Sequence, residues 1–105
     1  MADLVVTFGR IAGPVMRGRD CRSERIAIAA GTDPTIGQMV CDPGDNEGEN
    51  VADLLAEAAC WVEIGPDSFA HDPLNTTTSS FKMASGERLQ KAIQKGDKVS
   101  VVVVV

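Results

Sequence analysis

The side chains that could do chemistry in this chain are few, and they form no catalytic pattern. His71 is the single histidine, and it stands between Asp67 and Asp72 in a loop bounded by Pro66 and Pro73. A histidine beside carboxylates can act as a general acid or base or bind a metal, but in such a loop a solvated histidine is the ordinary outcome. No serine or cysteine has a base that the sequence places beside it. We therefore expect the protein not to be an enzyme and to have no catalytic residues.

Metal and cofactor sites are equally poorly supported. The three cysteines, Cys21, Cys41 and Cys60, form no C-x-x-C pair, so we expect no zinc site. Their odd number and wide spacing indicate thiols in a reducing compartment. The acidic segment 42–50 departs from the spacing of a calcium-binding loop, because Pro43 and Gly44 follow its first aspartate. We expect a solvated loop there and no metal or cofactor, with cation binding as the alternative.

The charges are segregated along the chain. Residues 1–25 carry a net charge of +2, residues 26–81 carry −10 without a single lysine or arginine, and residues 82–105 carry +3, which gives −5 in all. Opposed fields of this kind favour contact with other copies or with a large complementary surface. Strand pairing that interleaves the blocks is the alternative. The negative total and the scarcity of aromatic residues disfavour binding to nucleic acid.

The basic residues of the first block are all arginines. Arginine makes planar, bidentate contacts and suits protein interfaces, and glycines break regular structure between them. We therefore predict an extended arm over residues 1–25 that lies on a partner, followed by one domain over 26–105. The candidate interface residues are Arg10, Arg17, Arg19, Arg22 and Arg25.

The sequence pattern predicts that the elements positioning the candidate residues are strands. In the stretch Ala59–Pro66, alternation places Cys60, Val62 and Ile64 on one face, with Trp61 and Glu63 on the other. Apolar bulk on both faces suits a strand inside a two-layer β structure, with Trp61 as its largest apolar contribution. The predicted core residues are Cys60, Trp61, Val62, Ile64, Val99, Val101 and Val103.

Short strands also fit the rest of the chain, with turn signals between them. We predict strands within residues 3–8, 25–30, 35–41, 76–83, 87–93 and 99–105, and a hairpin at 95–98. Segment 51–59 has helical propensity, yet it runs directly into the tryptophan strand. Two strands joined by a bend near Ala56–Ala58 are favoured over a helix. The prediction is an all-β protein: a compact sandwich or jelly-roll-like domain with an extended N-terminal arm.

Two further features bear on location. Nothing at the start of the chain matches a signal peptide. The longest apolar run, Val101–Val105, is far shorter than a membrane span requires. We expect a soluble protein that is made in a cytoplasm and does not insert into membranes.

Three segments of the C-terminal half carry a family resemblance. They are Ala59–Pro66 (ACWVEIGP), Ser85–Leu89 (SGERL) and Lys95–Val102 (KGDKVSVV). Together they resemble small structural proteins of tailed bacteriophages, in which a strand of this kind precedes a glycine turn and a closing valine-rich strand. Such proteins are similar to capsid decoration, or cement, proteins, which are all-β and sit on the assembled head.

The resemblance covers residues 51–105 and implies a non-enzymatic role on the virion surface. The implied partners are the major capsid protein and other copies of the chain, with a trimer as one arrangement, and the implied site of synthesis is the cytoplasm of a bacterial host. Placing the arginine arm against the capsid is our inference from charge. The alternatives are a neck, tail or head-completion component, or a small β barrel that binds a ligand or nucleic acid.

Overall fold

Nine strands and no helix make up the described parts of the chain. The computed structural model describes residues 2–12, 15–16, 21–28, 34–41, 49–66, 73–74 and 80–104, with the side chains of 10–12, 15–16 and 49 left out. The strands are β1 (Asp3–Ala12), β2 (Val15–Met16), β3 (Arg22–Ala27), β4 (Thr35–Ile36), β5 (Glu49–Ala56), β6 (Cys60–Pro66), β7 (Phe81–Met83), β8 (Arg88–Ala92) and β9 (Asp97–Val103).

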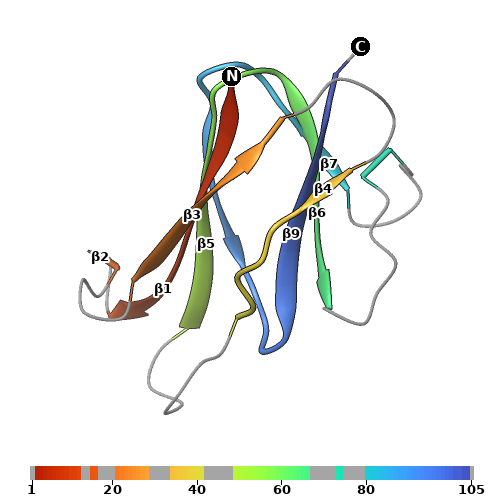
Figure 1. The fold of residues 1–105 in the computed structure, drawn as a ribbon. Helices are drawn as coiled ribbons and strands as arrows, with labels where there is room; N and C mark the ends of the chain where they lie inside the picture. The colour runs from red at the N-terminus through yellow and green to blue at the C-terminus, as the bar shows by residue number, and fades with distance from the viewer. Residues whose placement is uncertain are drawn as a thin grey trace.

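The strands form two antiparallel sheets that face each other as a sandwich (Figure 1). In the first sheet the order is β2-β1-β5-β8, and β3 pairs with the same edge of β1 as β2 does. In the second sheet the order is β4-β9-β6-β7. The predicted all-β sandwich is confirmed. Two edges of different sheets, β7 and β8, lie on one side of the sandwich, while β3 and β4 are the edges on the other.

The bend between β5 and β6 is confirmed over the helical alternative. β5 ends at Ala56, Glu57 and Ala58 form the bend, and β6 begins at Cys60 in the other sheet. The alternating burial of β5 explains why its helical propensity is overridden: Ala52, Leu54 and Ala56 face the core. A strand buries this row on one face, and tertiary packing outweighs a propensity of a few tenths of a kcal/mol per residue.

The core lies between the two sheets. Its first-sheet side comes from β1, β3 and β5, and its second-sheet side from β6, β7 and β9. Four of the predicted core residues, Cys60, Val62, Val99 and Val101, are completely buried. Ile64 and Val103 are half-buried and pack against that core.

Trp61 requires a correction. It is half-buried and lies on the face of β6 opposite Cys60 and Val62, outside the core between the sheets. On that outer face the ammonium of Lys82 lies 5.9 Å from the centre of the indole ring. Glu63, on the same face, is fully buried. Alternation correctly separates the two faces of β6, but apolar bulk on both faces cannot indicate which one meets the other sheet.

The predicted boundary between an arm at 1–25 and a domain at 26–105 also requires correction. β1 pairs with β5 from Leu4 to Ile11 and with β3 from Asp3 to Phe8, so it lies inside the first sheet. Its inward residues Leu4, Val6 and Phe8 are among the most buried of the chain. The strand predicted at 3–8 is therefore confirmed and is part of the domain. Residues 13–14 and 17–20 of the predicted arm lie outside the described residues.

The remaining predicted strands correspond to shorter or shifted ones. The strand predicted at 25–30 is β3, which starts at Arg22, and the one at 87–93 is β8. The strand predicted at 76–83 is described only from residue 80, where it gives β7. The strand predicted at 35–41 has two residues in β4. Beyond them, the amides of Gly37 and Cys41 donate to β9 carbonyls at 2.7 and 2.8 Å.

The turn at 95–98 is confirmed, but its strands do not form a hairpin. Gly96 has a φ of 90°, which a residue with a side chain rarely adopts, and the Asp97 amide donates to the Gln94 carbonyl at 3.1 Å. β8 pairs with β5, whereas β9 pairs with β4 and β6. The turn therefore carries the chain from one sheet to the other. The strand predicted within 99–105 is the main part of β9, and its residues 99–102 are buried.

Candidate functional site

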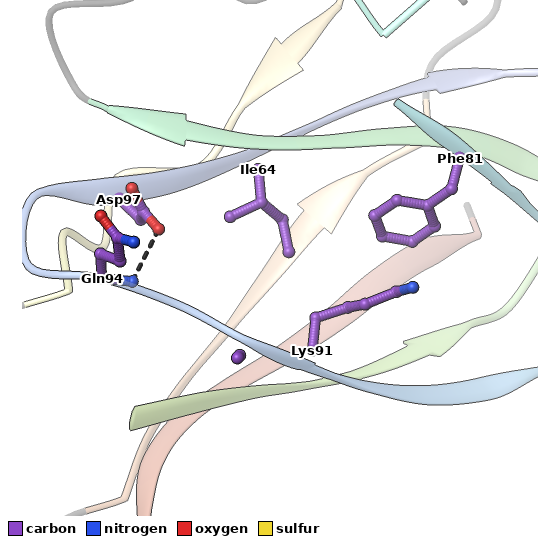
Figure 2. Close-up of a pocket in the computed structure, with 6 residues that line it drawn as sticks. Ile64, Phe81, Lys91, Gln94 and Asp97 are labelled. Atoms are coloured by element: carbon purple, nitrogen blue, oxygen red, sulfur yellow. Dashed lines mark hydrogen bonds between the residues drawn. The ribbon is translucent and has the colours of Figure 1, made fainter. Parts of the chain in front are cut away.

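A small cleft opens on the side of the sandwich where β7 and β8 are the edge strands. Figure 2 shows the residues that line it, which we call the β7–β8 cleft: Ile64, Phe81, Lys91, Ala92, Gln94 and Asp97. β6 supplies Ile64, β7 supplies Phe81, and β8 supplies Lys91 and Ala92. Gln94 lies in the turn after β8, and Asp97 begins β9. The two crossings between the sheets, at 84–87 and 94–97, border this side, so the cleft is built by the fold and not by one loop.

The cleft combines three apolar side chains with a lysine, a glutamine and an aspartate. The ammonium of Lys91 lies 4.7 Å from the centre of the Phe81 ring, a cation–π distance. At the other end the backbone amide of Gln94 donates to the Asp97 carboxylate at 2.8 Å (Figure 2). Ile64 lies between these two ends. Within the described part of the chain no carboxylate pairs with Lys91.

The size and chemistry of the cleft indicate what it can accept. Its volume is about 250 Å³, below the range of roughly 300–1,000 Å³ typical of small-molecule and cofactor pockets. None of its lining side chains is a serine, cysteine or histidine nucleophile or base. The cleft suits one or two apolar side chains of a partner, with a carboxylate beside Lys91.

The outer face of the first sheet is a second candidate surface. Among the described residues it carries two ion-pair groups: Arg25 with Asp3 and Glu57 at 3.4 and 3.3 Å, and Arg88 with Asp53 at 3.2 Å. Both arginine side chains remain more than three-fifths exposed, so each pair contributes little to stability. Because their charges are nearly balanced, these groups do not give the face one strong sign.

The group around Glu57 shifts two pKa values. A hydrogen bond from the Asp3 amide at 2.9 Å, followed by one from the Arg25 guanidinium, lowers the pKa of Glu57. The carboxylates of Glu57 and then Asp3 raise the pKa of Arg25. The group therefore stays ionised over a wide pH range, and it joins the start of β1, the end of β5 and β3.

The five candidate interface arginines divide into three groups. The backbone of Arg10 lies in β1, but its side chain is outside the described atoms, as are Arg17 and Arg19 entirely. Arg25 makes the ion pairs above. Arg22 is exposed and donates to the Val40 carbonyl at 2.9 Å. Arg22 and Arg25 thus have contacts within the chain, which the charge pattern alone did not indicate.

Arg22 and its neighbour Glu24 connect β3 to segment 37–40 on the side of the sandwich where β3 and β4 are the edge strands. From the same strand, β3, the Glu24 carboxylate accepts hydrogen bonds from the amides of Gln38 and Met39 at 3.0 and 3.2 Å. Segment 37–40 leaves the regular pairing with β9 at this point, and the two side chains hold it against β3. We call these contacts the β3 clamp; they satisfy backbone groups that the strand pairing leaves open.

Of the residues singled out for possible chemistry, the structure describes all three cysteines. Burial, with a smaller contribution from Glu87, raises the pKa of the Cys60 thiol to about 11. The three cysteines form no disulfide. Among the described residues no group of three or more His, Cys, Asp or Glu side chains could hold a metal ion. His71 with Asp67 and Asp72, and residues 42–48 of the acidic loop, lie outside that part of the chain.

Comparison with protein families, with curated proteins and with solved structures found no match to this chain. The described residues also contain no helix long and apolar enough to cross a membrane.

The sequence reading missed the β7–β8 cleft. Its residues come from four elements that are adjacent only because β7 and β8 become edges of different sheets. One signal was present: Lys91 is a charged residue at an inward position of its strand, opposite the buried Ala52. An inward charge is typical of an edge strand.

Proposed function

We propose that the protein is a non-enzymatic capsid decoration protein of a tailed bacteriophage, which binds the assembled shell of major capsid protein and stabilises it. The observation that carries the proposal is the pairing of β6 with β9. These strands hold two of the three segments that resemble phage decoration proteins, and they pair from Cys60 with Val103 to Pro66 with Asp97. The third segment forms the turn at Ser85–Gly86 and the start of β8, where Gly86 has a φ of 82°.

This arrangement supports the proposal because two of the resembling segments are neighbouring strands of one sheet. The third segment lies in the turn and strand that follow β7 and belong to the other sheet. This order of strand, turn and closing strand is compatible with the resemblance. The absence of an assembled catalytic group in the described residues is compatible with a binding role but does not carry it.

Binding to the shell would use many weak contacts repeated over a symmetric surface. On this proposal the candidates Arg17 and Arg19 supply positive charge for capsid carboxylates. Repetition makes modest affinities effective, since the copies bound to one particle hold neighbouring subunits together. On this proposal the protein is synthesised in the bacterial cytoplasm and resides on the outer surface of the virion, with major capsid protein and its own copies as partners.

The direct test compares purified particles with and without the protein by cryo-electron microscopy and quantitative protein analysis. We expect density over the whole shell and one copy for every few capsid subunits, together with lower resistance to heat when the protein is absent. Copies confined to a single vertex would replace the proposal with a neck, tail or head-completion role. Absence from mature particles would overturn both.

A second test addresses the arginines. The double substitution Arg17→Ala with Arg19→Ala should lower occupancy on particles and leave the melting temperature unchanged. Lys82→Ala is the matched control, because it removes a positive charge that lies over Trp61 on the second sheet. Unchanged occupancy in the double variant would show that these arginines do not contact the shell.

A further inference from the structure

The outer edge of β8 has backbone groups available for another strand. The Ala56 amide donates to the Glu87 carbonyl and the Ile93 amide to the Asn50 carbonyl, both at 3.0 Å. In an antiparallel ladder the bonded residues of one strand alternate. Leu89 and Lys91 therefore bond to β5, whereas the backbone groups of Arg88, Gln90 and Ala92 point away from it, and no described strand pairs with that edge.

Three cations lie along this edge. β8 carries Lys91 and Arg88, the latter paired with Asp53, and the turn that follows carries Lys95, while Glu87 precedes β8 and Asp97 follows the turn. The inward side chain of Lys91 lies over Phe81 at the mouth of the β7–β8 cleft, beside the apolar wall formed with Ile64 (Figure 2). The backbone of a strand added here could bond to the outer edge of β8. Its alternate side chains would reach the cleft and the ammonium of Lys91.

The same charges argue against a second copy as the occupant. If two β8 strands paired antiparallel about Gln90, Lys91 of one copy would lie opposite Leu89 of the other and diagonal to the other Lys91, so two like charges would share one face, which is destabilising. An inward lysine on an edge strand is a common protection against such pairing. Pairing of this edge with a second copy is therefore disfavoured, and a strand that supplies carboxylates is favoured.

We propose that the outer edge of β8 binds an extended, acidic segment of a partner protein as an added strand, with an apolar side chain in the β7–β8 cleft and a neighbouring carboxylate on Lys91. Binding of such a segment does not depend on whether the partner is a capsid protein. Such binding predicts a pattern in the partner: apolar and acidic residues at alternate positions on one face of the strand.

The test uses a short capped peptide that has valine, glutamate and valine at alternate positions, with threonine between them. Titration into the isotopically labelled full-length protein should shift the amide signals of Arg88, Gln90 and Ala92 and slow their hydrogen exchange. The amides of Leu89 and Lys91 already bond to β5 and should gain little protection. The same peptide with lysine in place of glutamate should bind more weakly.

Two substitutions separate the backbone contribution from the charge. Gln90→Pro removes an outward amide without touching the pairing with β5 and should abolish binding, whereas Gln90→Thr keeps the amide and should retain it. Lys91→Met should weaken binding by about two- to fivefold, the range of an exposed ion pair. Lys91→Glu should reverse the preference toward the lysine peptide. That reversal decides the matter even if the proline variant does not fold.

Three results would overturn the assignment. One is equal binding to the wild type and to a folded Gln90→Pro protein. Another is a set of shifts confined to the outer face of the first sheet, around Arg25 and Asp53. The third is the absence of a saturable shift at millimolar peptide, whether or not the protein self-associates through β8.

Discussion

The β3 clamp makes a quantitative prediction for Glu24. Its two carboxylate oxygens accept from the Gln38 amide at 3.0 Å and the Met39 amide at 3.2 Å. Glu24→Ala removes both acceptors at once. Water can replace the acceptor at the exposed Gln38 amide, but the Met39 amide is partly buried and loses its partner at greater cost.

The magnitude follows from these two contacts. A hydrogen bond to a charged group contributes about 1.5–3 kcal/mol, and an exposed one less. Taking about 2 kcal/mol for the Met39 bond and a few tenths for the Gln38 bond, we expect Glu24→Ala to lower the free energy of unfolding by about 2 kcal/mol. In a domain of this size that corresponds to a fall in melting temperature of about 10 °C.

Urea unfolding followed by tryptophan fluorescence measures this loss, and amide exchange at Gln38 and Met39 locates it. Glu24→Gln is the matched control, since it keeps one oxygen acceptor of similar geometry and should lose about half as much. Gln38→Ala alters the same segment without removing an acceptor and should be close to neutral. If Glu24→Ala changes stability by less than about 0.5 kcal/mol, as an ordinary surface substitution does, the clamp carries no stability and the reasoning fails.

Gly37 provides an independent check on the same geometry. A methyl group there would overlap Glu24 Oε1 and lie 2.7 Å from Ile26 Cδ1 and 3.1 Å from the Val99 carbonyl. Gly37→Ala should therefore destabilise by about 1–3 kcal/mol, as overpacking does. Part of that cost should vanish in combination with Glu24→Ala, because one of the overlaps disappears. Strictly additive effects in the double-mutant cycle would contradict the contact.

Three further predictions concern the core and titration. Leu54→Ala should cost about 2–5 kcal/mol and Trp61→Ala less, because Leu54 is fully buried between the sheets and Trp61 is not; a larger thermal shift for Trp61 would reverse this order. The lowered pKa of Glu57 means that its stabilisation is present above its unfolded pKa and is lost as the pH falls through the folded value. Glu57→Gln should therefore be less stable than wild type near neutrality and converge with it in acid, and a constant difference in urea unfolding at every pH would refute this. Burial raises the pKa of Cys60 to about 11, so its thiol should react with a thiol reagent at neutral pH only after unfolding, and rapid labelling of the native protein would contradict its burial. Its contribution to stability holds below the pKa of the unfolded state and is lost as the pH rises toward 11.

The local features of the fold could be read from the sequence. The bend between β5 and β6 and the turn at Gly96 depend on neighbouring residues, and alternation assigned Val62 and Val99 to the core. The same rule applied to Leu4, Val6 and Phe8 would have placed β1 in the domain. The density of arginine and glycine after Phe8 instead favoured an arm, because charge describes solvent exposure and says nothing about strand pairing.

The features that depend on distant pairing could not be read. Whether Trp61 faces the other sheet depends on which neighbours β6 acquires, and alternation is the same in either case. Turn residues at 95–98 specify a reversal but not whether the two strands share a sheet. The cleft at Lys91 and the clamp at Glu24 both arise where edges of different sheets meet, so no local pattern contains them.

The position of the strand ends has a mechanical consequence. The start of β1 and the end of β9 lie at the same pole of the sandwich, opposite the turn between β8 and β9 (Figure 1). Tension applied between these two ends would peel each strand from its neighbours one backbone bond at a time, beginning at Asp3 and at Val103. A load spread over a sheet face would instead strain many bonds together. The molecule should thus yield at low force when pulled from its ends and resist far more when pressed or sheared through its broad sides.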